Sequence, residues 1–302
     1  MQGQHRVYMT AWRSGSSVGR SAHCTWWLRV RFRRGTFRKW PFLNFARSGC
    51  HWGRPQSILR YPYYMRSQVL INDDANSILN SNFDVTKVTV FLAHGWNGNG
   101  ENGMNQLLTE AFLQNGDVNV IVLDWNRLAN RNYVTAKSGT ADVGKGLGQF
   151  LNWLVTLGVS YEKVHLVGFS LGGHLVGNAG RETGGLVRRI TALDPAGPLW
   201  SSDSNRVAPT DGQYVEVIHT NTAFLGYSDV CGDADFYPNG GSSMPGCWLN
   251  TCSHSRAYEY MASTVKHDHL LANECYTFRD ASRNRCNGDL YSMGNSDLNK
   301  SR

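Results

Sequence analysis

The chain has 302 residues, of which 41% are hydrophobic and 12% aromatic, enough to fill the core of one large domain or two small ones. No apolar run approaches the length of a membrane-spanning helix, so we expect no transmembrane segment. The net charge of +7 is unevenly placed, because residues 1–72 hold thirteen Lys and Arg residues and no acidic residue. The rest of the chain is net acidic, which argues against a domain that binds nucleic acid.

Residues 1–58 are interpreted as a basic leader, and residues 59–302 as the main domain. The stretch HCTWWLRVRFRR (23–34) mixes Trp and Arg without a clear helical or strand-like pattern. Basic residues with interleaved aromatics suit an anionic membrane or a nucleic acid. We favour a disordered or wrongly assigned leader. It holds no signal peptide, because no adequate apolar run follows the basic start.

From about Tyr61 onward, apolar strand-like runs alternate with helical segments. We expect helices at 102–115 and 143–157, with another after Ser170, and strands at 69–71, 87–93, 118–123, 164–169, 189–193 and 214–218. This alternation predicts an α/β fold with a mostly parallel central sheet covered by helices on both faces. In such sheets, functional groups gather beyond the carboxyl ends of the strands.

One stretch carries a nucleophile motif. The apolar run 164–169 leads into Gly168-Phe169-Ser170-Leu171-Gly172, which fits G-x-S-x-G, the tight strand-to-helix turn that exposes a serine. We call residues 168–172 the elbow. A helix that begins after the serine directs its free N–H groups at negative charge developing there. Ser170 is therefore the candidate nucleophile.

An acid and a base are expected further along the chain, in the order serine, acid, histidine. Asp194 directly follows the strand 189–193 and lies in the turn LDPAGP (193–198). His165 within a strand and His174 within a helix are interpreted as structural. His219 at a strand end and His254, in a loop between Cys252 and a helix starting near Arg256, remain as candidates for the base.

Acyl transfer also needs two backbone N–H donors for the oxyanion. One is the N–H of Leu171, the residue after the nucleophile. The other is expected from the glycine-containing loop after an earlier strand, where HGW (94–96) makes the N–H of Trp96 the candidate. His94 is expected to fix this loop.

Seven cysteines indicate an oxidising compartment. No spacing is typical of a zinc site. We predict disulfides between Cys247 and Cys252 and between Cys275 and Cys286. The pairing of the other three is left open: Cys24, Cys50 and Cys231.

Several of these stretches together resemble the pancreatic lipase family over roughly residues 58–294. They are SNF (81–83), HGW (94–96), DW (124–125), the elbow, LDPAGP (193–198), VEVIHT (215–220), DFYPNGG (235–241), PGC (245–247) and CSHSR (252–256). The resemblance implies an α/β-hydrolase fold with Ser170 as nucleophile, Asp194 as acid and His254 as base. It also implies that His219 is structural.

The resemblance bears on the substrate as well. The triglyceride lipases of this family carry a long helical lid between the cysteines that match Cys247 and Cys252, but only four residues lie between them here. The loop 220–234 is short too. Both features are similar to the insect phospholipase A1 branch. Trp248 and Leu249 are then candidates to touch a lipid surface.

Two departures from the family pattern matter. Vertebrate lipases bind calcium after the catalytic acid, and Asp203 and Asp211 match two ligands, but Ala208 stands where another carboxylate is expected. We therefore expect no metal and no cofactor. The chain ends at Arg302, so we expect a truncated catalytic domain without the C-terminal β-sandwich domain.

The sequence thus predicts a secreted serine ester hydrolase that releases fatty acid from the sn-1 position of phospholipid at a lipid–water surface. A triacylglycerol or galactolipid lipase is one alternative. A non-catalytic lipid-binding or yolk-type protein on the same fold is another, although such proteins lose triad residues and this chain retains all three.

Overall fold

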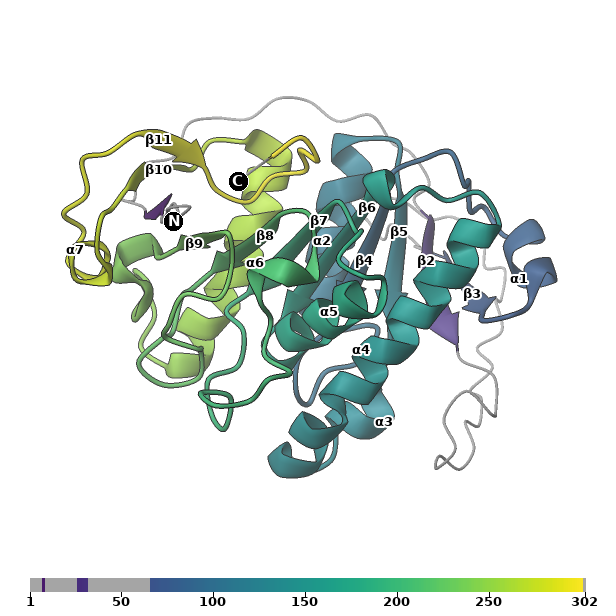
Figure 1. The fold of residues 1–302 in the computed structure, drawn as a ribbon, viewed down its shortest axis with the longest axis horizontal. Coiled ribbons are helices and arrows are strands. Elements are labelled where there is room, and N and C mark those ends of the chain that lie inside the picture. Colours follow the sequence, from purple (N-terminus) through teal and green to yellow (C-terminus); the bar gives the residue numbers. More distant parts are fainter. Residues whose placement is uncertain (1–6, 9–25, 32–65, 301–302) are drawn as a thin grey trace, which may run out of the picture.

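In the computed structural model, residues 7–8, 26–31 and 66–300 are described. Its centre is an eight-stranded sheet in which every pair of neighbours is parallel (Figure 1). In spatial order the strands are β3 (Arg66–Ile71), β2 (Trp26–Arg31), β5 (Asn119–Leu123), β4 (Thr89–Ala93), β6 (Val164–Phe169), β7 (Arg189–Leu193), β8 (Val215–Ile218) and β9 (Ala234–Phe236). The middle strands are rich in Val, Ile and Leu and buried throughout, as expected for a sheet covered on both faces.

The register of this sheet brings the candidate site together. Phe169 of β6 pairs with Leu193 of β7, and Leu193 pairs with Ile218 of β8. The next residue after each of the first two strands is a predicted site residue, Ser170 or Asp194. Because neighbouring parallel strands end at one edge, these side chains start within one strand spacing of each other.

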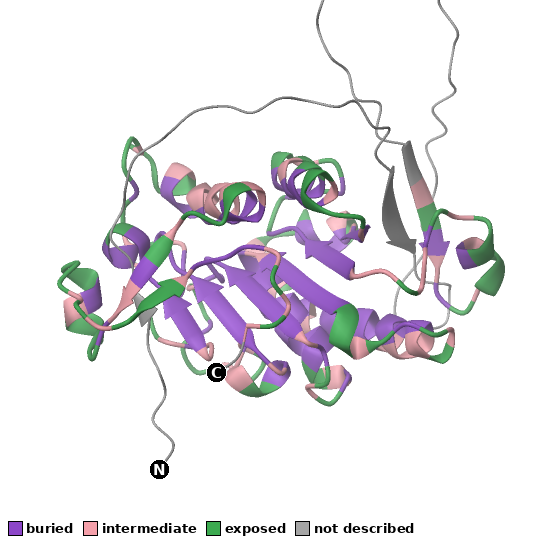
Figure 2. Cartoon of the chain, turned by 90° about the horizontal axis from the view of Figure 1, so that it is seen from above, coloured by how far each residue is buried: buried purple, intermediate pink, exposed green. Residues whose placement is uncertain are grey.

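Helices cover both faces of the sheet, as Figures 1 and 2 show from two directions. One face packs against α3 (Asn126–Ala129), α4 (Tyr133–Thr156) and α5 (Leu171–Glu182). The other packs against α2 (Gly103–Asn115) and α6 (Asn250–His267). The predicted α/β-hydrolase class is confirmed.

Close packing of α4 on α5 explains glycines within α4. A Cβ at Gly144 would lie 2.5 Å from the carbonyl oxygen of Leu175, and one at Gly148 would lie 2.6 Å from that of Ala179. These two positions are four residues apart and therefore share one helix face. Their missing side chains let the two backbones approach, which fixes the helix that follows Ser170.

Smaller elements complete the described part. A three-stranded sheet contains β1 (Val7–Tyr8), β10 (Leu271–Glu274) and β11 (Leu290–Ser292). Two short α-helices and three 3-10 helices lie in connections: α1 (Ala75–Leu79), α7 (Phe278–Ser282), η1 (Tyr161–Lys163), η2 (Pro209–Asp211) and η3 (Pro238–Gly241). Within the described ranges, no helix has the length and hydropathy needed to cross a membrane.

The structure differs from the sequence analysis in the leader. Strand β2, for which no strand was expected, lies between β3 and β5 in the central sheet. Its sequence WWLRVR does alternate apolar and basic residues from Leu28 to Arg31, the period of a strand, but the run is short. Strand β1 also belongs to the leader and pairs with β10, whereas the remaining residues of the leader, with Cys24 and Cys50, lie outside the described residues.

Candidate active site

The elbow holds Ser170 in an unusual backbone conformation. Its φ is 56° and its ψ is −120°, although serine rarely adopts positive φ. The turn is fixed because the N–H of Ser170 donates to the Leu193 carbonyl at 3.0 Å, while its own carbonyl accepts from Gly173 and Ala196. Helix α5 begins at the next residue. Such a turn suits a serine that must stand clear of its backbone.

The flanking glycines are sterically required here. A Cβ at Gly168 would clash with the backbone of Gly172, and one at Gly172 would clash with the backbone of Ala93. Strand β6, helix α5 and the end of β4 therefore meet at the elbow with no room for larger residues.

Asp194 and His254 form a close pair. His254 Nδ1 lies 2.5 Å from Asp194 Oδ2, and the other oxygen of Asp194 accepts the backbone N–H groups of Thr220 at 2.7 Å and Asn221 at 3.1 Å. The Asp194 side chain is fully buried. With both carboxylate oxygens engaged, Asp194 has one orientation in which to hold the imidazole.

The imidazole lies beside the elbow. The ring of Phe169, the residue before Ser170, packs against the ring of His254 with centroids 4.5 Å apart and against Tyr258 edge-on at 5.1 Å. Ser170 and His254 are each 8% exposed. Among the described residues, no hydrogen bond joins the Ser170 hydroxyl to the imidazole. Such contacts often tighten only when substrate binds.

The prediction that His254 lies in a loop before a helix near Arg256 is wrong. Helix α6 begins at Asn250, so His254 is in its second turn. The first turn is held by the Cys247–Cys252 disulfide and by the N–H of Met244, which donates to Ser253 Oγ at 3.0 Å. The candidate base is thus presented by a helix whose first turn is fixed.

The loop after β4 lies against the elbow. We call residues 94–97 the oxyanion loop, after the role predicted above for the N–H group of Trp96. A Cβ at Gly95 would lie 2.8 Å from the Cβ of Ser170. Among the described residues, the backbone N–H groups of Trp96 and Leu171 have no acceptor. Two free backbone donors beside one serine are what an oxyanion requires.

The remaining candidate histidines have other contacts. His165 Nε2 lies 2.8 Å from Thr191 Oγ1 within the sheet. His174 Nε2 faces the Ala196 carbonyl at 2.8 Å, and its Nδ1 accepts the N–H of Val207, which fixes a neutral ring. Burial lowers the pKa of His174 to about 3, against a smaller opposing effect of the Ala196 carbonyl.

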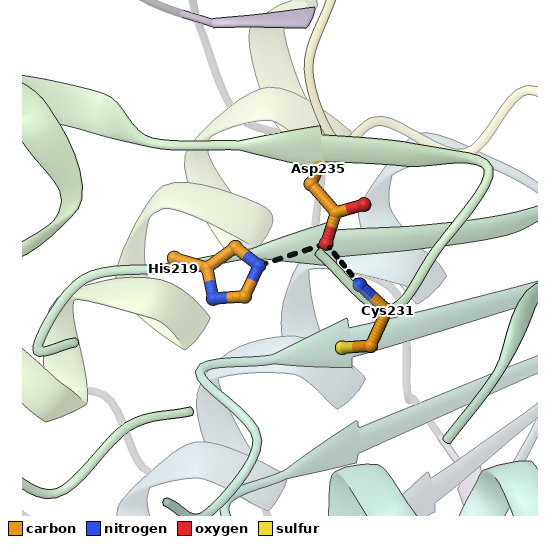
Figure 3. Close-up of side chains that lie close together, drawn as sticks. All are labelled: His219, Cys231 and Asp235. Atoms are coloured by element: carbon orange, nitrogen blue, oxygen red, sulfur yellow. Dashed lines mark hydrogen bonds and ion pairs between the residues drawn. The ribbon is translucent and has the colours of Figure 1, made fainter. Parts of the chain in front are cut away.

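His219 belongs to another buried histidine–aspartate pair (Figure 3). Its Nε2 lies 2.9 Å from Asp235 Oδ1 and its Nδ1 lies 2.8 Å from the Tyr227 carbonyl. Asp235 also accepts the N–H of Cys231. The donor atoms of His219, Cys231 and Asp235 lie within 4.8 Å of one another, a spacing compatible with a metal ion. Because hydrogen bonds already engage both ring nitrogens of His219 and the carboxylate of Asp235, we interpret the group as structural.

The two carboxylates compared with calcium ligands are both in ion pairs. Asp203 pairs with Lys137, and buried Asp211 receives two hydrogen bonds from the guanidinium of Arg181, at 2.9 and 3.1 Å. The same guanidinium donates to the carbonyls of Ser204 and Arg206.

The structure contains both predicted disulfides, Cys247–Cys252 and Cys275–Cys286, and leaves Cys231 as a buried free thiol. Between the first pair lie Trp248, 98% exposed, and Leu249, 69% exposed. Both side chains therefore face solvent just before the helix that carries His254.

Sequence reasoning missed the backbone donors of Thr220 and Asn221 to Asp194 and the partner of His219. The sequence did carry a signal for the donors to Asp194, because Thr220 and Asn221 follow β8, the neighbour of the strand that Asp194 follows. It carried no signal for the partner of His219, since Asp235 lies sixteen residues further along the chain.

Known proteins were compared with the chain. Residues 58–296 match the family model described as Lipase. Lipase member H of Oryctolagus cuniculus is 36% identical over 242 residues, 76% of this chain and 54% of that protein. Pancreatic lipase-related protein 2 of Rattus norvegicus is 36% identical over 70% of this chain and 52% of that protein. Pancreatic triacylglycerol lipase of Myocastor coypus is 35% identical over 72% of this chain and 54% of that protein.

The chain therefore spans about half the length of the curated relatives it matches. The match covers the strands, the elbow and the helix that together form the site. The chain belongs to the pancreatic lipase family.

Proposed function

We propose that the chain is a secreted carboxylic-ester hydrolase in which Ser170 attacks the ester, His254 is the base and Asp194 orients it. The observation that carries this proposal is the 2.5 Å contact of His254 with Asp194 beside the positive-φ serine. Two disulfides support an oxidising compartment.

Each catalytic step has a group suited to it. His254 Nδ1–H donates to Asp194, so Nε2 is the nitrogen that takes the Ser170 proton as Oγ attacks the ester carbonyl. The N–H groups of Trp96 and Leu171 receive the oxyanion. His254 returns the proton to the leaving alcohol, and water then releases the fatty acid from the acyl-enzyme.

Phospholipid, cleaved at the sn-1 position, is the substrate class that we propose. The short loop between Cys247 and Cys252 has four residues, too few to cover a site, which leaves room for a polar headgroup. Exposed apolar side chains in the loops after β7 and β8 and before α6 suit contact with a lipid surface, namely Leu199, Phe224, Trp248 and Leu249.

The test is hydrolysis of defined lipids by the full chain, produced under conditions that form disulfides. We expect fatty acid from the sn-1 position of phosphatidylcholine vesicles and little from a triglyceride emulsion. Ser170→Ala abolishes the release, whereas Ser138→Ala, at an exposed serine of α4, retains it.

The outcomes separate the alternatives. Equal or faster triglyceride hydrolysis would overturn the phospholipid assignment and favour a neutral lipase, the activity named for the Myocastor coypus relative. A folded chain without Ser170-dependent release from any ester would overturn the enzyme and favour a lipid-binding protein.

A further inference from the structure

We propose that the indole N–H groups of Trp96 and Trp125 are positioning groups that hold the oxyanion loop at the distance that its N–H donor requires. The inference rests on the proposed ester hydrolysis. It assigns to Trp96 a second role: its side chain fixes the peptide whose own N–H faces the oxyanion.

The oxyanion loop is tied to one neighbouring segment, residues 124–131, which follows β5. Trp125 Nε1–H donates to the His94 carbonyl at 2.8 Å, and Trp96 Nε1–H donates to the Arg131 carbonyl at 2.8 Å. Between these, the backbone N–H of Asn97 donates to the Ala129 carbonyl at 3.0 Å. Three hydrogen bonds thus hold four consecutive residues.

Ring contacts add to this attachment. The imidazole of His94 stacks on the indole of Trp125 at 5.5 Å and 14°. Trp96 packs edge-on against Tyr133 at 5.5 Å, and the Tyr133 hydroxyl donates to the Pro198 carbonyl in the loop after β7. The loop is thereby linked to both sides of the site.

Trp96 is 43% exposed, which by itself would favour a side chain that touches substrate or lipid. Its polar N–H is nevertheless directed at a backbone carbonyl. A backbone N–H stabilises an oxyanion only when it lies within a few tenths of an ångström of the required position. A loop that loses one of its hydrogen bonds therefore loses part of the transition-state stabilisation.

The experiment replaces each indole by an apolar ring that cannot donate: Trp96→Phe and Trp125→Phe, in the full chain. The control is Trp153→Phe, because Trp153 packs against Phe150 in α4, away from the loop. A water-soluble short-chain ester is the substrate, so that binding to a lipid surface does not contribute. Thermal unfolding of each variant is followed in parallel.

We expect kcat to fall roughly tenfold to a hundredfold in each loop variant with KM unchanged, and the control to retain its kcat. Inhibition by an alkyl boronic acid, which forms a tetrahedral adduct on the serine, weakens by the same factor. If the indoles had only a structural role, their replacement would lower the unfolding temperature but would change neither kcat nor the affinity for the boronic acid.

Two results would overturn the inference. One is a kcat within about twofold of the parent in both variants. The other is a raised KM with kcat unchanged, which makes the indoles substrate contacts. If Trp125→Phe fails to fold, exposed Trp96→Phe still decides. A parent chain without Ser170-dependent activity contradicts instead the proposed ester hydrolysis.

Discussion

The pairs His219–Asp235 and His254–Asp194 both lie near the carboxyl ends of neighbouring strands of the central sheet, and they differ in how their ring nitrogens are engaged and in their burial. His219 has both ring nitrogens engaged, one by Asp235 and one by the Tyr227 carbonyl, and is fully buried. His254 has Nδ1 engaged by Asp194, is 8% exposed, and has no partner for Nε2 among the described residues. A base needs a free nitrogen, so the His254 pair suits the proposed proton transfer, and we expect the His219 pair to contribute to stability.

The largest expected effect comes from removing the free nitrogen. His254→Ala lowers kcat roughly 10⁶-fold, because Ser170 then lacks a base. His267→Ala, at an exposed position on the same helix, leaves kcat unchanged. Initial rates on a soluble ester measure both. A His254→Ala enzyme that retains a tenth of the parent rate would contradict the assignment.

Replacing one carboxylate in each pair sharpens the comparison. Asp194→Asn still accepts the N–H groups of Thr220 and Asn221, but its amide cannot accept the proton of His254 Nδ1. We expect kcat to fall roughly 10⁴-fold with the fold retained. Asp235→Asn is the matched change in the other pair, and it leaves the kcat of the folded enzyme within a few fold of the parent value. Equal losses in the two variants would remove the distinction.

The His219 pair is expected to act on stability. His219→Ala leaves the Asp235 carboxylate buried without its partner and lowers the free energy of unfolding by about 3 kcal/mol. Urea unfolding measures this loss, and active-site titration corrects kcat for folded protein. A variant as stable as the parent but inactive would assign the base to His219.

His174 is expected to make stability depend on pH. Its pKa is about 3 in the folded chain and about 6.5 in the unfolded chain, so between these values the unfolded state binds more protons. Stability from this group is complete above about pH 6.5 and falls by about 1.4 kcal/mol per pH unit as the pH drops. His174→Gln gives a shallower slope in urea unfolding, and an unchanged slope would contradict this.

The sequence predicted those parts of the site that depend on local pattern. The strand at 189–193 matches β7 residue for residue, and Ser170 and Asp194 follow their strands as expected. Apolar runs bounded by glycine and Asp-Pro turns define such elements without long-range information.

Other features depend on contacts between distant parts of the chain. Helix α6 starts early because a disulfide and Met244 fix its first turn, which residue preferences near Asn250 do not indicate. Strand β2 is defined by its pairing with β5, about ninety residues away along the chain. The attachment of the oxyanion loop to Trp125 likewise spans 31 residues.

Covalent labelling tests the central claim most directly. The intact chain is treated with a long-chain alkyl fluorophosphonate, which phosphonylates an activated serine, and the modified peptide is identified by mass spectrometry. We predict one label, on Ser170, which is lost in Ser170→Ala and forms much more slowly in His254→Ala. His219→Ala keeps the labelling rate of the parent once the rate is corrected for the fraction of folded protein. A label on another serine, or equal labelling in the parent and His254→Ala, would contradict the account.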